Sequence, residues 1–141
     1  MARPWLLLSP FVLAAAMSAG DARAAETSIT LDDVAVPPAG SGVDHAALKT
    51  AAEGELRGVD ASRLRKRRTV LVSIAVIGSS QSPFGCTINA LLRDAKTGTM
   101  LAIIEGRAHA EGDANADLRK QVLRAAVRSA VSQIPAALAA N

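Results

Sequence analysis

The sequence is poor in aromatic residues. Its 141 residues include no tyrosine, one tryptophan (Trp5) and two phenylalanines (Phe11 and Phe84). Modules that bind single-stranded nucleic acids stack the bases on aromatic rings, and carbohydrate-binding sites very often use ring faces as well. The composition therefore argues against nucleic acid as a partner and against a carbohydrate stacking site.

Cysteine and histidine are also scarce, because Cys86 is the only cysteine and His45 and His109 are the only histidines. A three-histidine zinc site is impossible with this inventory. The H-x-E run at 109–111 lacks the P-C-x-x-C partner of a zinc deaminase. We therefore predict no metal site and no cofactor.

A single cysteine cannot form an internal disulfide, so packing alone must hold the fold together. Free cysteine usually behaves as a small apolar residue, and we expect Cys86 to be buried. An exposed Cys86 with a histidine as its base would instead indicate a small thiol-dependent enzyme, which is the alternative function.

The N-terminus has the pattern of a secretory signal peptide. Arg3 precedes an apolar run of 13 residues (5–17), and a small-residue triplet, Ala-Arg-Ala, occupies 22–24. The run is shorter than the roughly 20 residues that a membrane-spanning helix needs. We predict a signal peptide over residues 1–24, cleavage near Ala24, and a periplasmic or secreted location. No cysteine follows the run to carry a bacterial lipid anchor.

Cleavage would change the charge balance only slightly. It would remove two of the 16 basic residues and one of the 13 acidic residues, so the net charge would fall from +3 to +2. A nearly balanced domain lacks the strong positive field of a dedicated nucleic-acid binder.

After the leader, residues 25–43 read as an extended arm or edge strand followed by a Pro/Gly linker, and residues 44–138 read as a single domain. Apolar spacing predicts a helix from Asp44 to Arg57 and a second helix over 116–134. Strands are predicted at 69–77, 86–94 and 99–108, with a loop at 78–85 and a turn that ends at Gly98. The strand at 69–77 is expected to be central, with both faces largely covered.

The order α-β-β-β-α favours a two-layer α+β fold. We expect a three- or four-stranded antiparallel sheet with two helices packed on one face, and an N-terminal edge strand is an option for the segment before Asp44.

A dense basic run before the strand at 69–77 is the sharpest local feature. It could dock on an anionic membrane surface, or it could be a solvated connector. The candidate binding residues are Arg63, Arg65, Lys66, Arg67 and Arg68.

The segment 113–117 has the D-x-N-x-D spacing that opens an EF-hand loop. The glycine and glutamate that such a loop needs are replaced by Leu118 and Arg124. We therefore interpret Asp113, Asn115 and Asp117 as the capped, acidic start of a helix.

These observations predict an exported, small, non-enzymatic cell-envelope protein that acts by binding. The expected partner is another envelope protein or an anionic membrane surface. A homodimer, through Cys86 or through sheet edges, is a further expectation.

Overall fold

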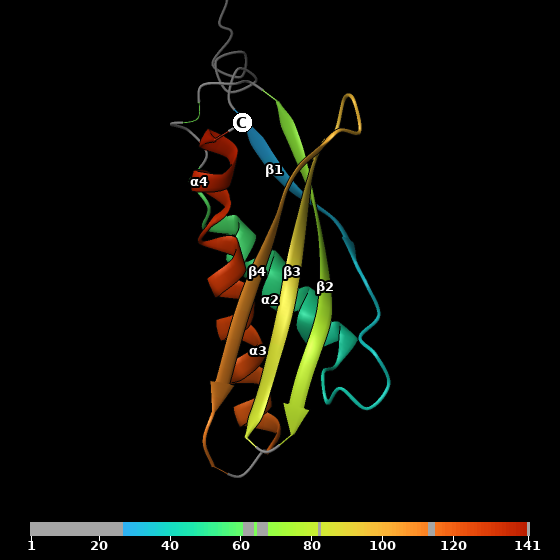
Figure 1. The fold of residues 1–141 in the computed structure, drawn as a ribbon, viewed down its shortest axis with the longest axis vertical. Coiled ribbons are helices and arrows are strands. Elements are labelled where there is room, and N and C mark those ends of the chain that lie inside the picture. The colour runs from blue at the N-terminus through green and yellow to red at the C-terminus, as the bar shows by residue number, and fades with distance from the viewer. Residues whose placement is uncertain (1–26, 61–63, 65–67, 82, 113–114, 141) are drawn as a thin grey trace, which may run out of the picture.

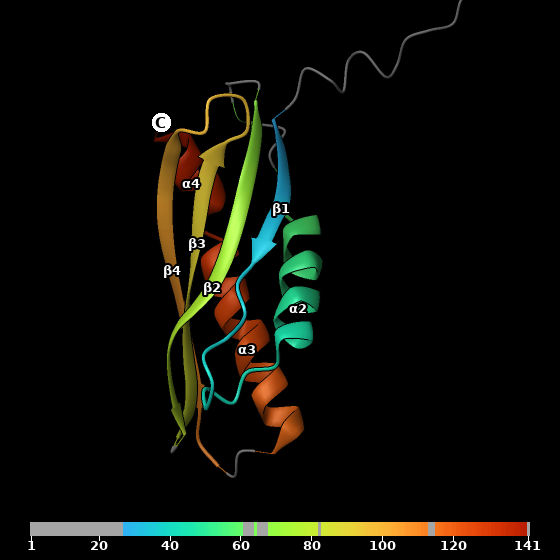
Figure 2. The ribbon, with the colours of Figure 1, turned by 90° about the vertical axis from the view of Figure 1, so that its right-hand side faces the viewer.

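The computed structural model describes residues 27–60, 64, 68–81, 83–112 and 115–140. A four-stranded sheet forms one layer, and the helices form a second layer on one of its faces (Figures 1 and 2). The elements, in chain order, are β1 (Ser28–Val34), α2 (His45–Arg57), β2 (Thr69–Gln81), β3 (Phe84–Asp94), β4 (Met100–Ala110), α3 (Ala116–Val131) and α4 (Ile134–Ala139). The predicted α+β class is confirmed.

The sheet is mixed, and here the prediction of a wholly antiparallel sheet is wrong. Its order is β1-β2-β3-β4, and β1 runs parallel to β2 while the other two pairs are antiparallel. The first segment is therefore an edge strand and not a free arm. A parallel partner needs a long crossover, and α2 is that crossover, so β1, α2 and β2 form a βαβ unit.

The hairpin between β2 and β3 is longer than expected. The predicted loop at 78–85 is mostly strand, because Ser80 pairs with Gly85 and Gln81 pairs with Phe84. The register shifts at a bulge between Val76 and Gly78, and beyond it the ladder continues past the apolar part of β2.

The core lies between the sheet and the helices. Alternate residues of β2 (Val70, Val72, Ile74 and Val76) are buried, while the residues between them are only partly buried. The expectation that both faces of this strand are largely covered is therefore too strong, because all described helices lie on one side of the sheet (Figure 2).

Helix ends follow the local sequence signals. Asp44 caps α2 by accepting a hydrogen bond from the amide of Ala47, and Asn115 caps α3 in the same way from Leu118. Gly58 ends α2, although with a right-handed φ of −86°. The second helix stops at Val131, earlier than predicted, and Pro135 lies in the first turn of the short α4.

Gly106 lets α3 rest directly on β4. A methyl group there would overlap the carbonyl oxygen of Ala126 and would lie 2.6 Å from the amide nitrogen of Ala130. The absence of a side chain at this position therefore sets the distance between the two layers.

Candidate functional site

The predicted basic run ends at Arg68, which links three elements at one end of the domain. The amide of Ser28 donates to the Arg68 carbonyl at 2.9 Å, and the Arg68 guanidinium donates to the Leu138 carbonyl at 3.4 Å. The starts of β1 and β2 and the end of α4 meet at this end of the molecule (Figure 1). The remaining basic residues lie outside the described part of the chain: Arg63, Arg65, Lys66 and Arg67.

Leu64 is the other described residue of this segment. Its side chain is partly buried and packs against the hydrophobic core. Leu64 and Arg68 thus attach the segment to the domain on either side of the stretch 65–67. We call the sequence segment from Arg63 to Arg68 the basic end, after the end of the domain at which its described residue Arg68 lies.

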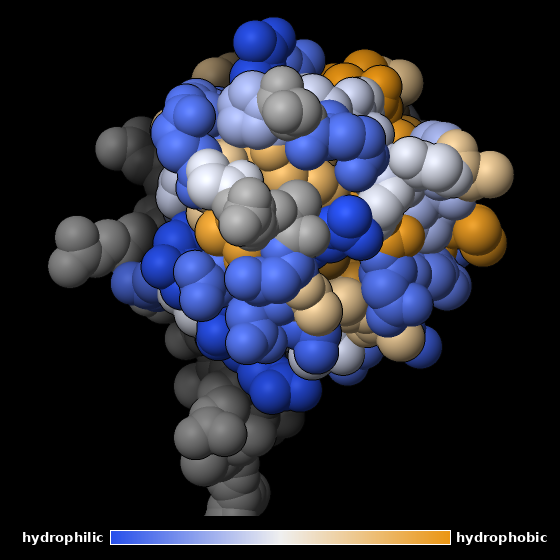
Figure 3. Space-filling view, turned by 90° about the horizontal axis from the view of Figure 1, so that it is seen from below, coloured by the Kyte–Doolittle hydropathy of each residue, from blue (hydrophilic) through white to orange (hydrophobic). Residues whose placement is uncertain are grey.

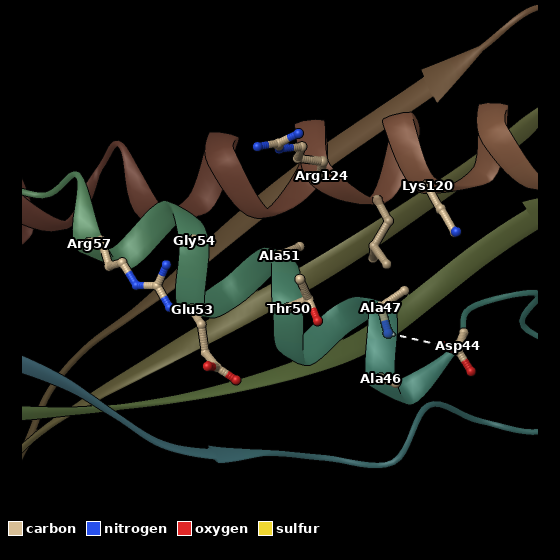
Figure 4. A pocket seen from close by; sticks show the side chains of 11 residues that line it. Asp44, Ala46, Ala47, Thr50, Ala51, Glu53, Gly54, Arg57, Lys120 and Arg124 are labelled. Carbon is tan, nitrogen blue, oxygen red and sulfur yellow. Dashed lines mark hydrogen bonds between the residues drawn. The ribbon is translucent and has the colours of Figure 1, made fainter.

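A groove of about 620 Å³ runs between α2 and α3 on the outer side of the helix layer. Figure 4 shows Lys120 of α3 opposite Ala47 near the start of α2 and Arg124 opposite Ala51, while Glu53 and Arg57 lie farther along α2. Part of the lining consists of small side chains, including Ala47 and Ala51. Such a groove offers charges of both signs around a shallow, partly apolar surface.

A second hollow, of about 190 Å³, lies where the first turns of α2 and α3 approach each other. Arg119 lines it, and its guanidinium lies over the ring of Phe84, 5.6 Å from the centroid. The Arg119 Nε is buried and has no hydrogen-bond partner among the described residues. Viewed from below, this end of the molecule shows hydrophobic atoms framed by hydrophilic ones (Figure 3).

Glu55 joins the two long helices. Its carboxylate Oε1 is 3.1 Å from Arg128 Nη2 and 3.6 Å from Arg124 Nε, and only 17% of its side chain is exposed. The hydrogen bond that Arg128 donates to Glu55 and the negative charge of Glu55 raise the pKa of the Arg128 guanidinium. These contacts hold α2 against α3, so they stabilise the walls of the groove.

Cys86 is buried on the core side of β3, with 2% of its surface exposed, and the prediction of burial is confirmed. Burial raises the pKa of its thiol to about 11. The thiol is therefore protonated and inaccessible at neutral pH, whereas a nucleophile needs the exposed thiolate. This geometry argues against the thiol-enzyme alternative.

The two histidines lie apart from Cys86 in the structure. His45 Nε2 lies 2.9 Å from the carbonyl oxygen of Val34. His109 is exposed on β4, paired with Gly85, whereas Cys86 pairs with Ala108. Neighbouring positions of a strand face opposite sides of the sheet, so His109 cannot serve the Cys86 thiol as a base.

Asn115 and Asp117 lie in the cap and the first turn of α3, as the helix-start interpretation predicts. Asp113 lies outside the described residues. Among the residues that the structure describes, no group of three or more His, Cys, Asp or Glu side chains could hold a metal ion.

Sequence reasoning missed the groove between α2 and α3, whereas it did expect one face of the sheet to be left uncovered by helices. The groove could not be foreseen, because it depends on how α2 and α3 pack. The uncovered face of the sheet had a signal: Leu91 and Ile103 are apolar at strand positions that alternate with the buried set. They pair with each other on β3 and β4, and Ile103 is 59% exposed.

In the described ranges, no helix has the length and apolarity that a membrane crossing requires.

Comparison with known proteins shows likeness of fold alone. No protein-family model matches the sequence, and no curated protein matches it. CT253, a hypothetical protein from Chlamydia trachomatis, is similar with a TM-score of 0.58 and 9% identity, over 83% of this chain and 100% of that chain. This likeness supports the two-layer α+β fold.

Two further bacterial proteins are similar with lower TM-scores. A PelC dodecamer from Paraburkholderia phytofirmans has a TM-score of 0.49 and 15% identity, over 84% of this chain and 92% of that chain. A minor lipoprotein from Acinetobacter baumannii has a TM-score of 0.42 and 10% identity, over 83% of this chain and 94% of that chain.

Proposed function

We propose that this protein is exported and works in the cell envelope as a non-catalytic binding protein whose basic end docks on an anionic membrane surface. The leader pattern of residues 1–24 supports export. The burial of Cys86, the one candidate nucleophile that the sequence offered, supports binding over thiol catalysis.

The hydrogen bond between Ser28 and Arg68 is the observation that carries this proposal. It ties the basic run to the start of β1, which is the point where the N-terminal segment enters the domain. Arg68 and the first described residues of the chain therefore lie at the same end of the domain. Five of the six residues from Arg63 to Arg68 are basic.

Each cation close to an anionic surface contributes on the order of 1 kcal/mol. The test uses protein isolated from cells that express the full chain, sedimented with vesicles that do or do not contain phosphatidylglycerol. We expect Arg65→Gln/Arg67→Gln to bind the anionic vesicles about 30-fold more weakly, which corresponds to about 2 kcal/mol. Added salt should weaken the native protein's binding as well.

The matched control is Lys49→Gln/Lys120→Gln, which removes the same charge from α2 and α3. Its binding should change far less than that of the double arginine variant. Equal loss in both variants would mean that only net charge matters, and unchanged binding in both would leave the basic end as a solvated connector.

The groove between α2 and α3 favours a second candidate function, capture of an envelope protein. Gly54 lines this groove, and a Cβ added there meets nothing within 4 Å. Gly54→Arg would therefore obstruct the groove without disturbing the core. A pull-down from envelope fractions should lose a specific partner with this variant and retain it with Arg65→Gln/Arg67→Gln.

A further inference from the structure

We infer that an apolar patch on the uncovered face of the sheet enters the bilayer surface when the basic end docks on an anionic membrane. The inference rests on the proposed docking and adds a second surface to it, one that contacts lipid without charge. Among the described residues, four large hydrophobic side chains are strongly exposed: Val36, Ile77, Met100 and Ile103. Two of them, Met100 and Ile103, lie close together on β4.

The strand register places Met100 and Ile103 on the same face. Ile103 pairs with Leu91, which alternates with the buried Leu92. Residues three apart on a regular strand face opposite sides. Between Leu92 and Arg93, however, one step on β3 corresponds to two steps on β4, and this bulge sets Met100 opposite Arg93. Both side chains are therefore on the face that the helices leave open (Figure 2). We call Leu91, Met100 and Ile103 the apolar patch.

Arg93 lies beside the apolar patch but points away from it. Its Nη2 atom donates to Asp32 Oδ2 at 2.8 Å. Asp32 belongs to β1, which lies on the far side of β2 from β3. The Arg93 side chain therefore crosses β2 and leaves β4 uncovered, and Met100 and Ile103 stay 56% and 59% exposed. The two charges of the ion pair offset each other, so neither opposes contact with lipid.

The apolar patch lies at the same end of the domain as the basic end. The amide of Ala95, in the turn that follows β3, donates to the carbonyl of Thr69 at 2.9 Å. Thr69 follows Arg68 directly in the chain. Figure 1 shows this turn beside the starts of β1 and β2. The hydrogen bond therefore joins the hairpin that carries the patch to the last residue pair of the basic segment.

Farther from the basic end, the same face of the sheet is polar. Asn89 pairs with Glu105, and Thr87 pairs with Arg107, at the next two positions along the ladder. The face is thus apolar only where cations are close to it. Apolar side chains beside clustered Lys and Arg are the combination that binds the interface of an anionic bilayer.

Charge favours lipid over a second copy of this chain as the occupant. In the turn, the Asp94 carboxylate accepts the amides of Lys96 and Thr97. The Lys96 side chain forms no ion pair with any residue that the structure describes. Two copies stacked through their patches would bring two basic ends together, and like charges repel each other. Anionic lipid would neutralise the same charges.

The dimensions of the patch fit the depth of the bilayer interface. Leu91 and Arg93 are two residues apart, so the two rows of the patch are about 7 Å apart. Apolar faces that lie in this interface are buried by roughly 5–10 Å. Both rows can therefore reach the boundary between head groups and acyl chains while the cations remain among the head groups.

The first test uses the vesicle sedimentation described above. Met100→Gln/Ile103→Thr should bind phosphatidylglycerol vesicles about ten-fold more weakly at low and at high salt alike, because burial of apolar area is not screened by ions. Val36→Thr/Ile77→Thr is the matched control. It removes two exposed hydrophobic side chains outside the patch and should bind as the native protein does. All four positions are more than half exposed, so circular dichroism should show the native fold in both variants.

The second test places a fluorescent probe in the patch. The described part of the chain has no tryptophan, and Trp5 lies in the leader pattern, so the native protein serves as the blank. With anionic vesicles, the emission of Met100→Trp should shift to shorter wavelength and should be quenched by lipids brominated on the acyl chains. Ile77→Trp should show neither change.

The outcomes separate the inference from the proposed function. Vesicle binding without a shift or quenching in Met100→Trp would overturn the inference and leave the docking of the basic end in place. A shift in a protein whose binding ignores Arg65→Gln/Arg67→Gln would support the patch and overturn the role of the basic end. A shift that grows with protein concentration without vesicles would assign the patch to a second copy, and a lack of binding to any vesicle would overturn both.

Discussion

Gly106 offers the sharpest test of how the two layers fit together. In Gly106→Ala, the new methyl group would overlap the Ala126 carbonyl and would lie 2.6 Å from the Ala130 nitrogen, where ordinary contact begins at 3.4 Å. The backbone of α3 must therefore lift over β4 by at least about 0.8 Å. A gap of this size forfeits a quarter to a half of the attraction between facing atoms.

Overpacking of this kind costs about 1–3 kcal/mol, and occasionally more. Because the clash is with helix backbone, which cannot rotate away, we expect the upper end of this range. Alanine also reduces the conformational freedom of the unfolded chain, and this offsets about 0.4–1 kcal/mol of the overpacking cost. The net result should be a loss of about 2 kcal/mol of unfolding free energy and a fall in Tm of about 8 °C.

Gly54→Ala is the matched control, because it adds the same methyl group at an exposed position of α2 with open space around it. Alanine in a helix interior gains about 0.5–1 kcal/mol over glycine. The two glycine variants should thus differ by about 3 kcal/mol in urea denaturation followed by circular dichroism. If the unfolding free energy of Gly106→Ala lies within about 0.5 kcal/mol of that of the native protein, α3 does not rest on β4 as described, and the reasoning fails.

Three further predictions test the core, the helix cap and the thiol. Leu92→Ala should lose about 2–5 kcal/mol of unfolding free energy. Leu91 is its neighbour on the uncovered face, and Leu91→Ala should lose well under half as much. Equal losses would contradict a core on one side of the sheet. Asn115→Ala should lose about 1 kcal/mol and Asn115→Asp far less, and added calcium should stabilise neither the native protein nor the Asp variant in thermal unfolding. Cys86 should resist a thiol reagent at neutral pH until denaturant is added; labelling of the native protein would reopen the enzyme hypothesis. Because burial raises the pKa of this thiol to about 11, above its value in the unfolded chain, its contribution to stability should be lost as the pH rises from about 9 through 11, and Cys86→Ala should lack that part of the decline.

Short-range features of this protein could be predicted from the sequence because their causes lie within a few residues. Asp44 and Asn115 cap helices through their own side chains, and Gly98 takes a φ of +77° in the turn before β4. The alternation of apolar and polar residues along β3 predicted which of its side chains are buried, Cys86 among them, because strand side chains alternate between the two faces of a sheet. The signal-peptide pattern of residues 1–24 and the charge of the basic run are likewise visible in the linear chain.

The candidate site could be predicted only in part. The basic residues were identified from their order in the chain, but their neighbours were not, because Ser28 and Leu138 are 40 and 70 positions away from Arg68. The predicted loop at 78–85 failed for a related reason. Its polar, glycine-containing residues have weak strand propensity of their own and become strand because β2 and β3 pair along their length.

By itself, then, the sequence determined the starts of the two long helices, the hairpin turn, the alternating faces of β3 and β4 and the scarcity of aromatic residues, because local geometry and composition decide these. Only the tertiary structure decided that β1 joins β2 in parallel, that α3 rests on Gly106, that a groove opens between α2 and α3, and that β4 is left at the edge of the sheet. Each of these depends on contacts between residues far apart in the chain, where packing of the whole core selects among arrangements that local preferences leave equal.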